Sequence, residues 1–336
     1  MFRVSYQELM DALLRGFLKL GFEAERARRC AQLFADTDRD GVYTHGLNRF
    51  PRFLFMIQSG LIDIHAEPVP IAGSGPLERW DGKLGPGNLN ASQCMERAIA
   101  LSQTHGMGCV ALANPNHWMR GGSYGWQAAD AGVIRICWTN TLANLPPWGA
   151  SDPRTGNNPL VIAVPRPEGH VVLDMAMSQF SYGTLASYRM RGELLPVDGG
   201  FDGKGNLTRD PGAIESSNRP LPIGFWKGSG LALMLDLLAA TLSGGKATHE
   251  IARTPEQETM ISQVFIAIDV SVLDRSQGKT AAAQVADQVI EHFQLPPHSA
   301  GKRVRYPGYR VLNTRKENLA NGIPLDPSIW QQLKAL

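Results

Sequence analysis

Short apolar runs that alternate with helical patterns constrain the fold of this 336-residue chain more than any other feature. Each run is bounded by turn residues and is short enough to be a buried strand. Longer amphipathic or apolar segments between the runs are typical of helices, and strands alternating with helices predict an α/β core. The expected strands are Cys109 to Ala113, Val133 to Thr139, Leu160 to Val164, Val171 to Met175 and Val264 to Val270, and the expected helices among them are Asn90 to Thr104, Gly122 to Ala131 and Leu231 to Leu242.

The two ends of the chain are predicted to be helical instead. Ser5-Tyr-Gln-Glu8 fits a capping box, which opens an amphipathic helix that we expect to end near Leu20. Further helices are expected over residues 23–38, 47–58, 281–293 and 327–336.

A stretch rich in Gly and Pro, residues 68–87, separates the helical N-terminal part from the middle of the chain. We therefore expect residues 69–279 to form the α/β core. Residues 1–68 are expected to pack with residues 280–336 as one discontinuous helical domain.

The charge balance excludes several classes of partner. The chain carries 33 Lys and Arg against 31 Asp and Glu, so it offers no broad basic surface to nucleic acid or to an anionic membrane. No segment has the uninterrupted apolar length that a membrane span needs, and the amphipathic N-terminus is not typical of a signal peptide. We expect a cytoplasmic protein without a membrane anchor. The four cysteines lie far apart without metal-ligand spacing, so we expect reduced, mostly buried thiols and no metal site.

Common nucleotide and hydrolase motifs are missing. The segment Gly85-Pro-Gly87-Asn-Leu-Asn90 resembles part of a dinucleotide fingerprint, but it lacks the third glycine and follows a loop. We interpret it as a turn into a helix. The chain has no GxxxxGK[ST], HExxH or GxSxG pattern, which argues against ATP chemistry, zinc proteolysis and serine hydrolysis.

The segment Tyr43-Thr-His45-Gly-Leu-Asn-Arg49 is a first candidate for chemistry. If a helix begins here, His45 and Arg49 lie four residues apart on one face. An arginine holds a carboxylate bidentately, and a histidine can protonate a carbonyl oxygen while the carbonyl carbon is reduced. The alternative is a structural histidine beside a surface arginine.

A second candidate lies in the loop that follows the first expected strand of the core. The sequence Asn116-His117-Trp-Met-Arg120-Gly-Gly leads from that strand toward a helix, a position where α/β proteins commonly bind ligands. It again supplies a histidine with an arginine, and we predict that Arg49 or Arg120 binds a substrate carboxylate. The alternative is that His117 caps the following helix.

Seven ordered segments of this chain together resemble the type-2 malate/L-lactate dehydrogenase family. The similarity extends almost from end to end and is closest to a branch that reduces diketo sugar acids. The segments are GVYTHGLNRFPRF (41–53), NHWMRGGSYGWQAA (116–129), CWTN (137–140), PPWGA (146–150), LPVDGGFD (195–202), WKGSG (226–230) and ISQVFIAI (261–268).

The resemblance implies an α/β, non-Rossmann NAD-binding fold with a mixed-sheet core and helical N- and C-terminal flanks, assembled as a homodimer. It implies reduction of 2,3-diketo-L-gulonate to 3-dehydro-L-gulonate, with His45 matching the proton donor of that branch. In other members the histidine that matches His117 takes the acid/base role. Competing hypotheses are a reductase of another 2-oxo acid, of the malate, lactate, ureidoglycolate or cyclic imino acid type, and a non-catalytic sugar-acid-binding protein. The presence of both His45 and Lys227 favours an enzyme.

The resemblance also places the cofactor. The positions that it implies are His170, Val171, Val172, Leu173, Asp174, Met175, Ala176, Trp226, Lys227, Gly308, Tyr309 and Arg310. Lys227 offers a charge to the pyrophosphate just before a helix. Arg310 departs from the branch, which carries an acidic residue there, and an arginine tolerates the 2'-phosphate of NADPH. NADH is the expected cofactor, with NADPH also accepted.

Overall fold

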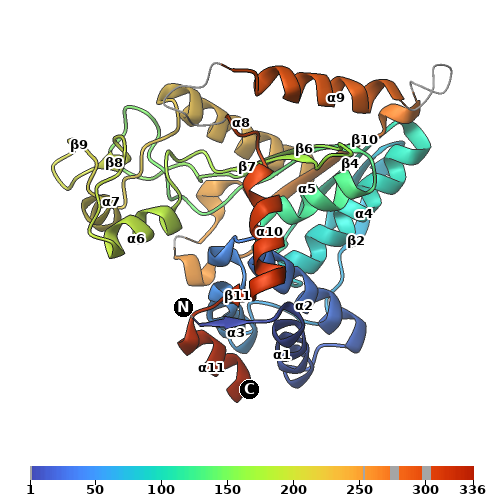
Figure 1. The fold of residues 1–336 in the computed structure, drawn as a ribbon, viewed down its shortest axis with the longest axis horizontal. Helices are drawn as coiled ribbons and strands as arrows, with labels where there is room; N and C mark the ends of the chain where they lie inside the picture. The colour runs from blue at the N-terminus through green and yellow to red at the C-terminus, as the bar shows by residue number, and fades with distance from the viewer. Residues whose placement is uncertain (1, 253, 273–279, 297–303) are drawn as a thin grey trace.

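A seven-stranded mixed sheet forms the centre of the molecule (Figure 1). The computed structural model describes residues 2–252, 254–272, 280–296 and 304–336. The sheet order is β2-β3-β4-β10-β5-β6-β7, and its neighbouring strands run antiparallel except for the parallel pair β3 and β4. The strands are β2 (Val69–Ser74), β3 (Leu77–Asp81), β4 (Met107–Ala113), β5 (Ile134–Thr139), β6 (Leu160–Val164), β7 (Val171–Met175) and β10 (Ser262–Ile268).

Helices cover both faces of this sheet. On one face α4 (Gly87–His105) and α5 (Gly121–Asp130) share an apolar core with the strands, and on the other face α8 (Trp226–Ser243) contributes to a second core. The late strand β10 lies between β4 and β5, which makes it a buried centre of the sheet. The expected mixed-sheet α/β fold without a Rossmann turn is therefore confirmed.

The two termini lie together at one end of the molecule (Figure 1). The short strand β1 (Arg3–Val4) pairs with β11 (Ile323–Pro324), and an aromatic cluster around Phe17 and Phe34 fills the core among the surrounding helices. Those helices are α1 (Tyr6–Lys19), α2 (Ala24–Arg39), α3 (Phe50–Gln58) and α11 (Pro327–Ala335). The Ser5 hydroxyl caps α1 by accepting a hydrogen bond from the N–H of Glu8 at 3.1 Å, as the sequence predicts.

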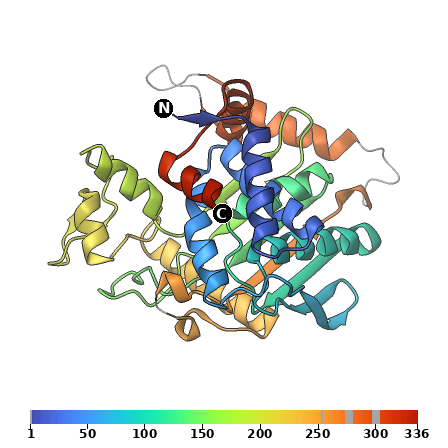
Figure 2. The same cartoon turned by 90° about the horizontal axis from the view of Figure 1, so that it is seen from below.

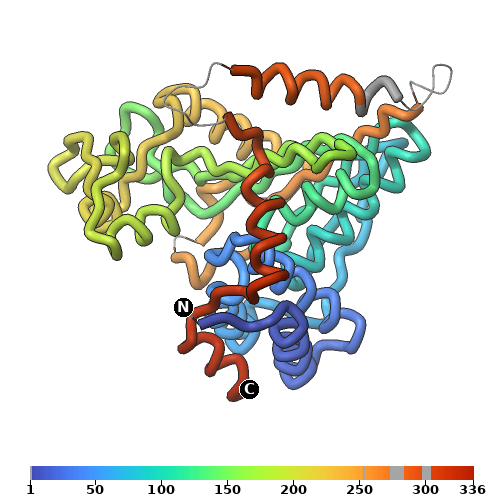
Figure 3. Tube along the Cα trace, in the orientation of Figure 1, coloured from blue at the N-terminus to red at the C-terminus, as the bar shows by residue number. Residues whose placement is uncertain are grey.

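Two C-terminal helices take different positions (Figure 3). The helix α10 (Tyr309–Asn321) runs from the sheet to the terminal helices. The helix α9 (Thr280–Phe293) lies at the far end from the termini, beside the β6–β7 turn, where Asp287 pairs with Arg166. The helices α10 and α11 therefore lie with the N-terminal helices, whereas α9 lies beside the sheet, and the division into two domains stays a prediction.

A lobe between β7 and α8 extends to one side of the sheet (Figure 2). It contains α6 (Tyr182–Met190), α7 (Pro211–Ser217), β8 (Gly200–Phe201) and β9 (Leu207–Thr208), around a small core of its own made by Leu185, Leu195 and Ile214. We call residues 182–217 the α6–α7 lobe. The sequence patterns did not predict it, because its elements are too short for a clear period.

The remaining elements are single 3-10 turns: η1 (Tyr43–His45), η2 (Leu47–Arg49), η3 (Thr248–Glu250), η4 (Pro255–Gln257) and η5 (Val270–Val272). Among the described residues, no helix has the length and apolar character that crossing a membrane requires.

Candidate functional site

His45 and His117 lie face to face although they are 72 positions apart in the sequence. Their ring centroids are 6.0 Å apart, and the ring planes meet at 26°. His45 ends the turn η1 after α2, whereas His117 lies in the loop between β4 and α5. The site therefore lies where the terminal helices meet the sheet.

The turn that carries His45 is tightly packed against Asp38. This side chain is 1% exposed, and its Oδ2 accepts a hydrogen bond from the N–H of Leu47 at 2.7 Å. A Cβ atom at Gly46 would lie 2.1 Å from Asp38 Oδ1, so no other residue fits between them. The predicted helix through His45 and Arg49 is not continuous, since two separate 3-10 turns occupy this segment.

Hydrogen bonds to Nδ1 orient both rings. Nδ1 of His117 accepts from the backbone N–H of Met119 at 3.0 Å, so the proton of the neutral ring is on Nε2. Nδ1 of His45 lies 2.8 Å from the hydroxyl oxygen of Thr44. These contacts leave Nε2 of His117 as a donor, and Nε2 of His45 as the nitrogen available to a ligand.

The surroundings keep both imidazoles neutral. Burial, together with the positive charges of Arg49 and Arg120, lowers the pKa of His45 to about 3. Burial and the charge of Arg49 also lower the pKa of His117 well below its usual value. At neutral pH the two rings therefore act as hydrogen-bonding groups without charge.

Among the residues that the structure describes, no carboxylate forms an ion pair with Arg49. Its pKa is lowered by burial and by neighbouring Arg52, and its buried Nε has no hydrogen-bond partner within the described ranges. The nearby carboxylate of Glu258 is already used, since it accepts from the backbone N–H of Leu142 at 3.0 Å and pairs with Arg52 at 3.2 Å. A half-buried guanidinium that has no ion pair among the described residues is a ready site for a ligand carboxylate.

Arg120 has a different environment. Its Nη1 donates to Asp40 Oδ2 at 2.7 Å. Nε and Nη2 of Arg315 donate to the same carboxylate at 2.7 and 2.8 Å, and Nε of Arg39 donates to it at 2.9 Å. Burial alone would raise the pKa of Asp40, but hydrogen bonds and charges from Arg315, Arg120 and Arg39 lower it to about 2. Asp40 thus ties α2 and α10 to the loop that carries His117. The predicted substrate contact of Arg120 remains a prediction, and the structure gives this side chain a partner within the chain.

The predicted cofactor segments converge on β7, the edge strand of the sheet. The outward-facing N–H of Val172 donates to the carbonyl of Pro307 at 3.1 Å. Gly308 follows with φ +93°, and a Cβ there would lie 3.1 Å from the carbonyl oxygen of His170. This brings residues 308–310 beside the start of β7. Just beyond the other end of the strand, the N–H of Ile223 donates to the carbonyl of Met177 at 2.9 Å. This contact brings the segment before Trp226 next to the end of β7.

Individual side chains of these segments differ in what they offer a cofactor. Lys227 and Arg310 are exposed. His170 is already engaged, because its Nδ1 accepts from the N–H of Arg166 at 3.1 Å and its Nε2 lies 2.9 Å from Asp130. Asp174 accepts from the N–H of Gly122 at 2.8 Å, in the first turn of α5. His170 and Asp174 are therefore engaged within the chain, whereas Lys227 and Arg310 are exposed.

Two acidic residues of the site, Asp38 and Asp40, were missed by the sequence reasoning. They lie in the last turn and at the end of an amphipathic helix, where acidic residues are usually solvated, and both are buried. A pair of carboxylates directly before the Gly41-to-Gly46 segment was the signal that could have indicated them. All four cysteines are free and buried, as predicted.

Residues 4–334 of this chain match the family model described as malate/L-lactate dehydrogenase. The chain belongs to this family, and it is an oxidoreductase that acts on CH–OH groups with a nicotinamide cofactor. Among its relatives, the 2,3-diketo-L-gulonate reductase of Citrobacter koseri is 47% identical and that of Escherichia coli strain K12 is 46% identical, each over 99% of this chain and 100% of the relative. The solved structure of sulfolactate dehydrogenase from Methanocaldococcus jannaschii superposes with a TM-score of 0.91 at 26% identity, covering 99% of this chain and 96% of that one.

Proposed function

We propose that this enzyme reduces the C2 keto group of a small keto sugar acid, 2,3-diketo-L-gulonate, to give 3-dehydro-L-gulonate. The observation that carries the proposal is the unpaired Arg49 guanidinium beside two neutral histidines. This arrangement matches a substrate with a carboxylate next to a carbonyl group. The names of the relatives in Citrobacter koseri and Escherichia coli support the choice of this substrate.

Arg49 binds the substrate carboxylate in this proposal. His45, which takes up a proton once that carboxylate is bound, donates it from Nε2 to the carbonyl oxygen as hydride reaches the carbon, and returns to the neutral ring. The bound carboxylate offsets the charge of Arg49, which is the second cause of the low pKa of His45, so substrate binding makes His45 a better proton carrier. His117 is the second substrate-facing residue and the competing proton donor. Its Nε2–H donates a hydrogen bond to the same oxygen or to its neighbour.

In this proposal the cofactor lies along β7. Residues His170 to Ala176 span roughly 20 Å at the usual rise of a strand, a length that suits an extended dinucleotide. Residues 308–310 lie beside one end of this edge, and the exposed Lys227 in the first turn of α8 offers its ammonium group to the pyrophosphate. The reduced nicotinamide supplies the hydride when it is bound. We infer NADH as the preferred cofactor, with NADPH accepted through Arg310.

We further infer that the enzyme acts as a homodimer in the cytoplasm. The helix α8 leaves a broad apolar face uncovered, with five large apolar residues between 38% and 51% exposed: Leu231, Leu233, Met234, Leu237 and Leu238. Contiguous exposed apolar surface of this kind is typical of a protein interface. A second copy burying this face by two-fold symmetry is the simplest cover for it. The four reduced cysteines fit a reducing compartment.

A panel of keto acids, assayed by the loss of NADH absorbance, tests the proposed function. We expect the highest kcat/KM for 2,3-diketo-L-gulonate, with lower values for pyruvate and oxaloacetate. A higher kcat/KM for an unhydroxylated 2-oxo acid would contradict the choice of substrate. Absence of turnover with every keto acid would contradict the enzyme assignment of this site.

A further inference from the structure

The side chain of Thr44 contacts the ring of the proposed proton donor. Its Oγ1 lies 2.8 Å from Nδ1 of His45, and Thr44 itself is an exposed residue of the turn η1. A hydroxyl group both donates and accepts hydrogen bonds, so it can bond to Nδ1 with or without a proton on that nitrogen. A carboxylate at this position would instead favour the charged ring. The hydroxyl therefore holds the ring without fixing its charge.

The methyl group of Thr44 faces the α6–α7 lobe. A Cβ atom at Gly183 would lie 2.6 Å from Cγ2 of Thr44 but 3.8 Å from its Oγ1. The backbone of Gly183 thus packs against the methyl group, while the hydroxyl contacts His45. Because threonine is branched at Cβ, a contact that fixes its methyl group also fixes the direction of its hydroxyl.

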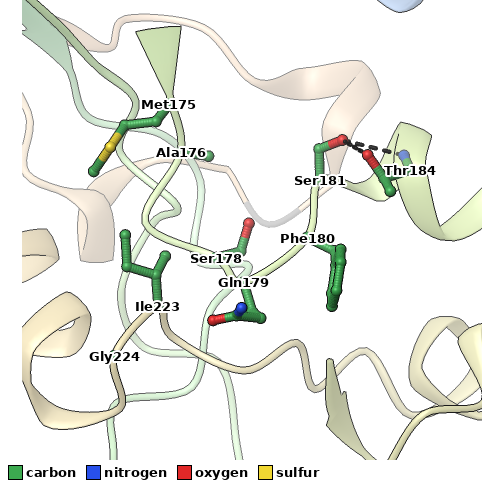
Figure 4. A pocket seen from close by; sticks show the side chains of 9 residues that line it. All are labelled: Met175, Ala176, Ser178, Gln179, Phe180, Ser181, Thr184, Ile223 and Gly224. Atoms are coloured by element: carbon green, nitrogen blue, oxygen red, sulfur yellow. Dashed lines mark hydrogen bonds between the residues drawn. The ribbon is translucent and has the colours of Figure 1, made fainter. Parts of the chain in front are cut away.

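The turn that carries Gly183 is capped. It is the first turn of α6, where the Ser181 hydroxyl accepts from the N–H of Thr184 at 3.1 Å and lies 2.8 Å from Oγ1 of Thr184 (Figure 4). Ser181 and Thr184 also line a cavity together with Met175, at the end of β7. The cap gives the backbone of Gly183 a defined position against Thr44.

We propose that Thr44 is a positioning residue, whose hydroxyl holds Nδ1 of His45 so that Nε2 faces the substrate, and whose methyl group is set by Gly183. The inference rests on the proposed function, in which His45 donates the proton. Of the two protons on the charged ring, the one on Nε2 moves to the carbonyl oxygen of the substrate, and the one on Nδ1 stays. The Thr44 oxygen accepts a hydrogen bond from this Nδ1–H before and after the transfer, so the ring keeps its orientation during the reaction.

The first test removes the hydroxyl. Thr44→Val keeps the shape of the side chain, and we expect kcat for 2,3-diketo-L-gulonate to fall about tenfold at saturating NADH, while KM and the Kd of NADH stay unchanged. Thr44→Ser retains the hydroxyl and should keep more of kcat than Thr44→Val. Thr104→Val is the matched control, because the exposed Thr104 donates only to the carbonyl of Ala100, at 3.3 Å within α4, among the described residues. Its kcat should equal that of the wild type.

The second test changes the lobe side of the contact. Gly183→Ala places a methyl group against Cγ2 of Thr44, and kcat should fall about three- to tenfold. In the Thr44→Ser background that Cγ2 is gone, and the nearest atom of residue 44 is Cβ at 3.4 Å, so Gly183→Ala should cause little further loss. Gly203→Ala, at an open position of the same lobe, is the control and should leave kcat unchanged.

A third measurement does not depend on turnover. The ring nitrogens of His45 and His117 are followed by NMR in protein that carries 15N-labelled histidine, at neutral pH and without substrate. Thr44→Val should shift the Nδ1 resonance of His45 more than that of His117, because only His45 loses a hydrogen-bond partner.

Several results would overturn the inference. An unchanged kcat or an unchanged Nδ1 resonance in Thr44→Val would show that the hydroxyl does not position His45. A raised KM or a raised Kd of NADH with normal kcat would mean that Thr44 contacts the substrate or the cofactor instead. Equal losses from Gly183→Ala in both backgrounds would remove the methyl contact from the proposal. If His45→Ala has near-normal kcat, or the wild type reduces no keto acid, the proposed function fails and the inference fails with it.

Discussion

Arg120 donates from Nη1 to Oδ2 of Asp40 at 2.7 Å, and the two side chains are only 3% and 2% exposed. Arg315 on α10 binds the same carboxylate, so one buried anion joins three parts of the chain. Removing one partner of a buried ion pair leaves an uncompensated charge, which strongly destabilises the fold. This holds even where the intact pair adds little to the free energy of unfolding.

Replacing Asp40 by Asn should lower the free energy of unfolding by about 3 to 5 kcal/mol, because it leaves buried guanidinium groups without their anion. Urea unfolding followed by circular dichroism measures the loss. Asp152→Asn is the control, since Asp152 pairs with Arg154 at an exposed position, where an ion pair contributes little to stability. Equal stability of the two variants would show that Asp40 is dispensable for the fold.

His45→Ala should lower kcat by about 10² to 10⁴-fold, the usual contribution of general acid catalysis, while the Kd of NADH stays unchanged. His117→Ala should have the smaller effect on kcat and a larger one on KM. Steady-state kinetics with NADH titrations for both variants separates these effects. Near-normal kcat for His45→Ala with loss of activity for His117→Ala would reassign the proton donor to His117.

Arg49→Lys keeps the charge and loses the planar fork, so KM for the keto acid should rise about tenfold or more while the Kd of NADH is unchanged. Arg49→Gln should in addition raise the pKa of His45, because the charge of Arg49 helps to lower it. Titration of the His45 ring by NMR measures this shift. An unchanged KM in Arg49→Lys would mean that another residue binds the carboxylate. Arg120→Lys, assayed in parallel, tests whether that residue is Arg120.

Arg310→Glu should lower kcat/KM with NADPH relative to NADH by about tenfold to a hundredfold, because a carboxylate repels the 2'-phosphate that an arginine attracts. The side chain is exposed at the start of α10, so the substitution should leave Tm unchanged. The ratio of the two kcat/KM values is the measurement. A ratio equal to that of the wild type would mean that Arg310 plays no part in the choice of cofactor.

Asp38→Asn should change how stability depends on pH. Burial raises the pKa of Asp38 to about 8, so the folded protein retains a proton that the unfolded chain loses near pH 4. Between these values the folded state binds more protons, and the free energy of unfolding falls as pH rises, by up to about 1.4 kcal/mol per unit. Asn removes this slope and can still accept from Leu47. Urea unfolding from pH 5 to pH 8 checks it, with the exposed Asp11→Asn as control, and parallel profiles for wild type and Asp38→Asn would refute it.

Much of the sheet could be predicted from local pattern. The strands β6 and β7 begin and end at the predicted residues, because apolar runs bounded by turn residues define them. The helix α4 begins at Gly87, three residues before the predicted Asn90, because the Gly85-to-Asn90 segment is indeed a turn into a helix. The position of β10 between β4 and β5 had no local signal, since it depends on pairing between residues more than 100 positions apart.

The candidate site was predictable in its residues but not in its charges. The proximity of His45 and His117 is a tertiary contact, and no spacing in the sequence encodes it. The two arginines looked equivalent as neighbours of histidines. Only the packing of α2 against α10 shows that Asp40 forms an ion pair with Arg120. Arg49, in contrast, has no hydrogen-bond partner for its Nε among the described residues.

The helix α10 is held by contacts at two points, whereas the α6–α7 lobe is not. Next to its first turn the chain is hydrogen-bonded to β7 through Pro307, and almost two turns further along Arg315 is held by Asp40. The α6–α7 lobe has only a small core of its own, and it meets the His45 turn where Gly183 contacts Thr44. We therefore expect the α6–α7 lobe to open more readily than α10, which is held at two points. Backbone amides of α6 should accordingly exchange with deuterium faster than those of α10.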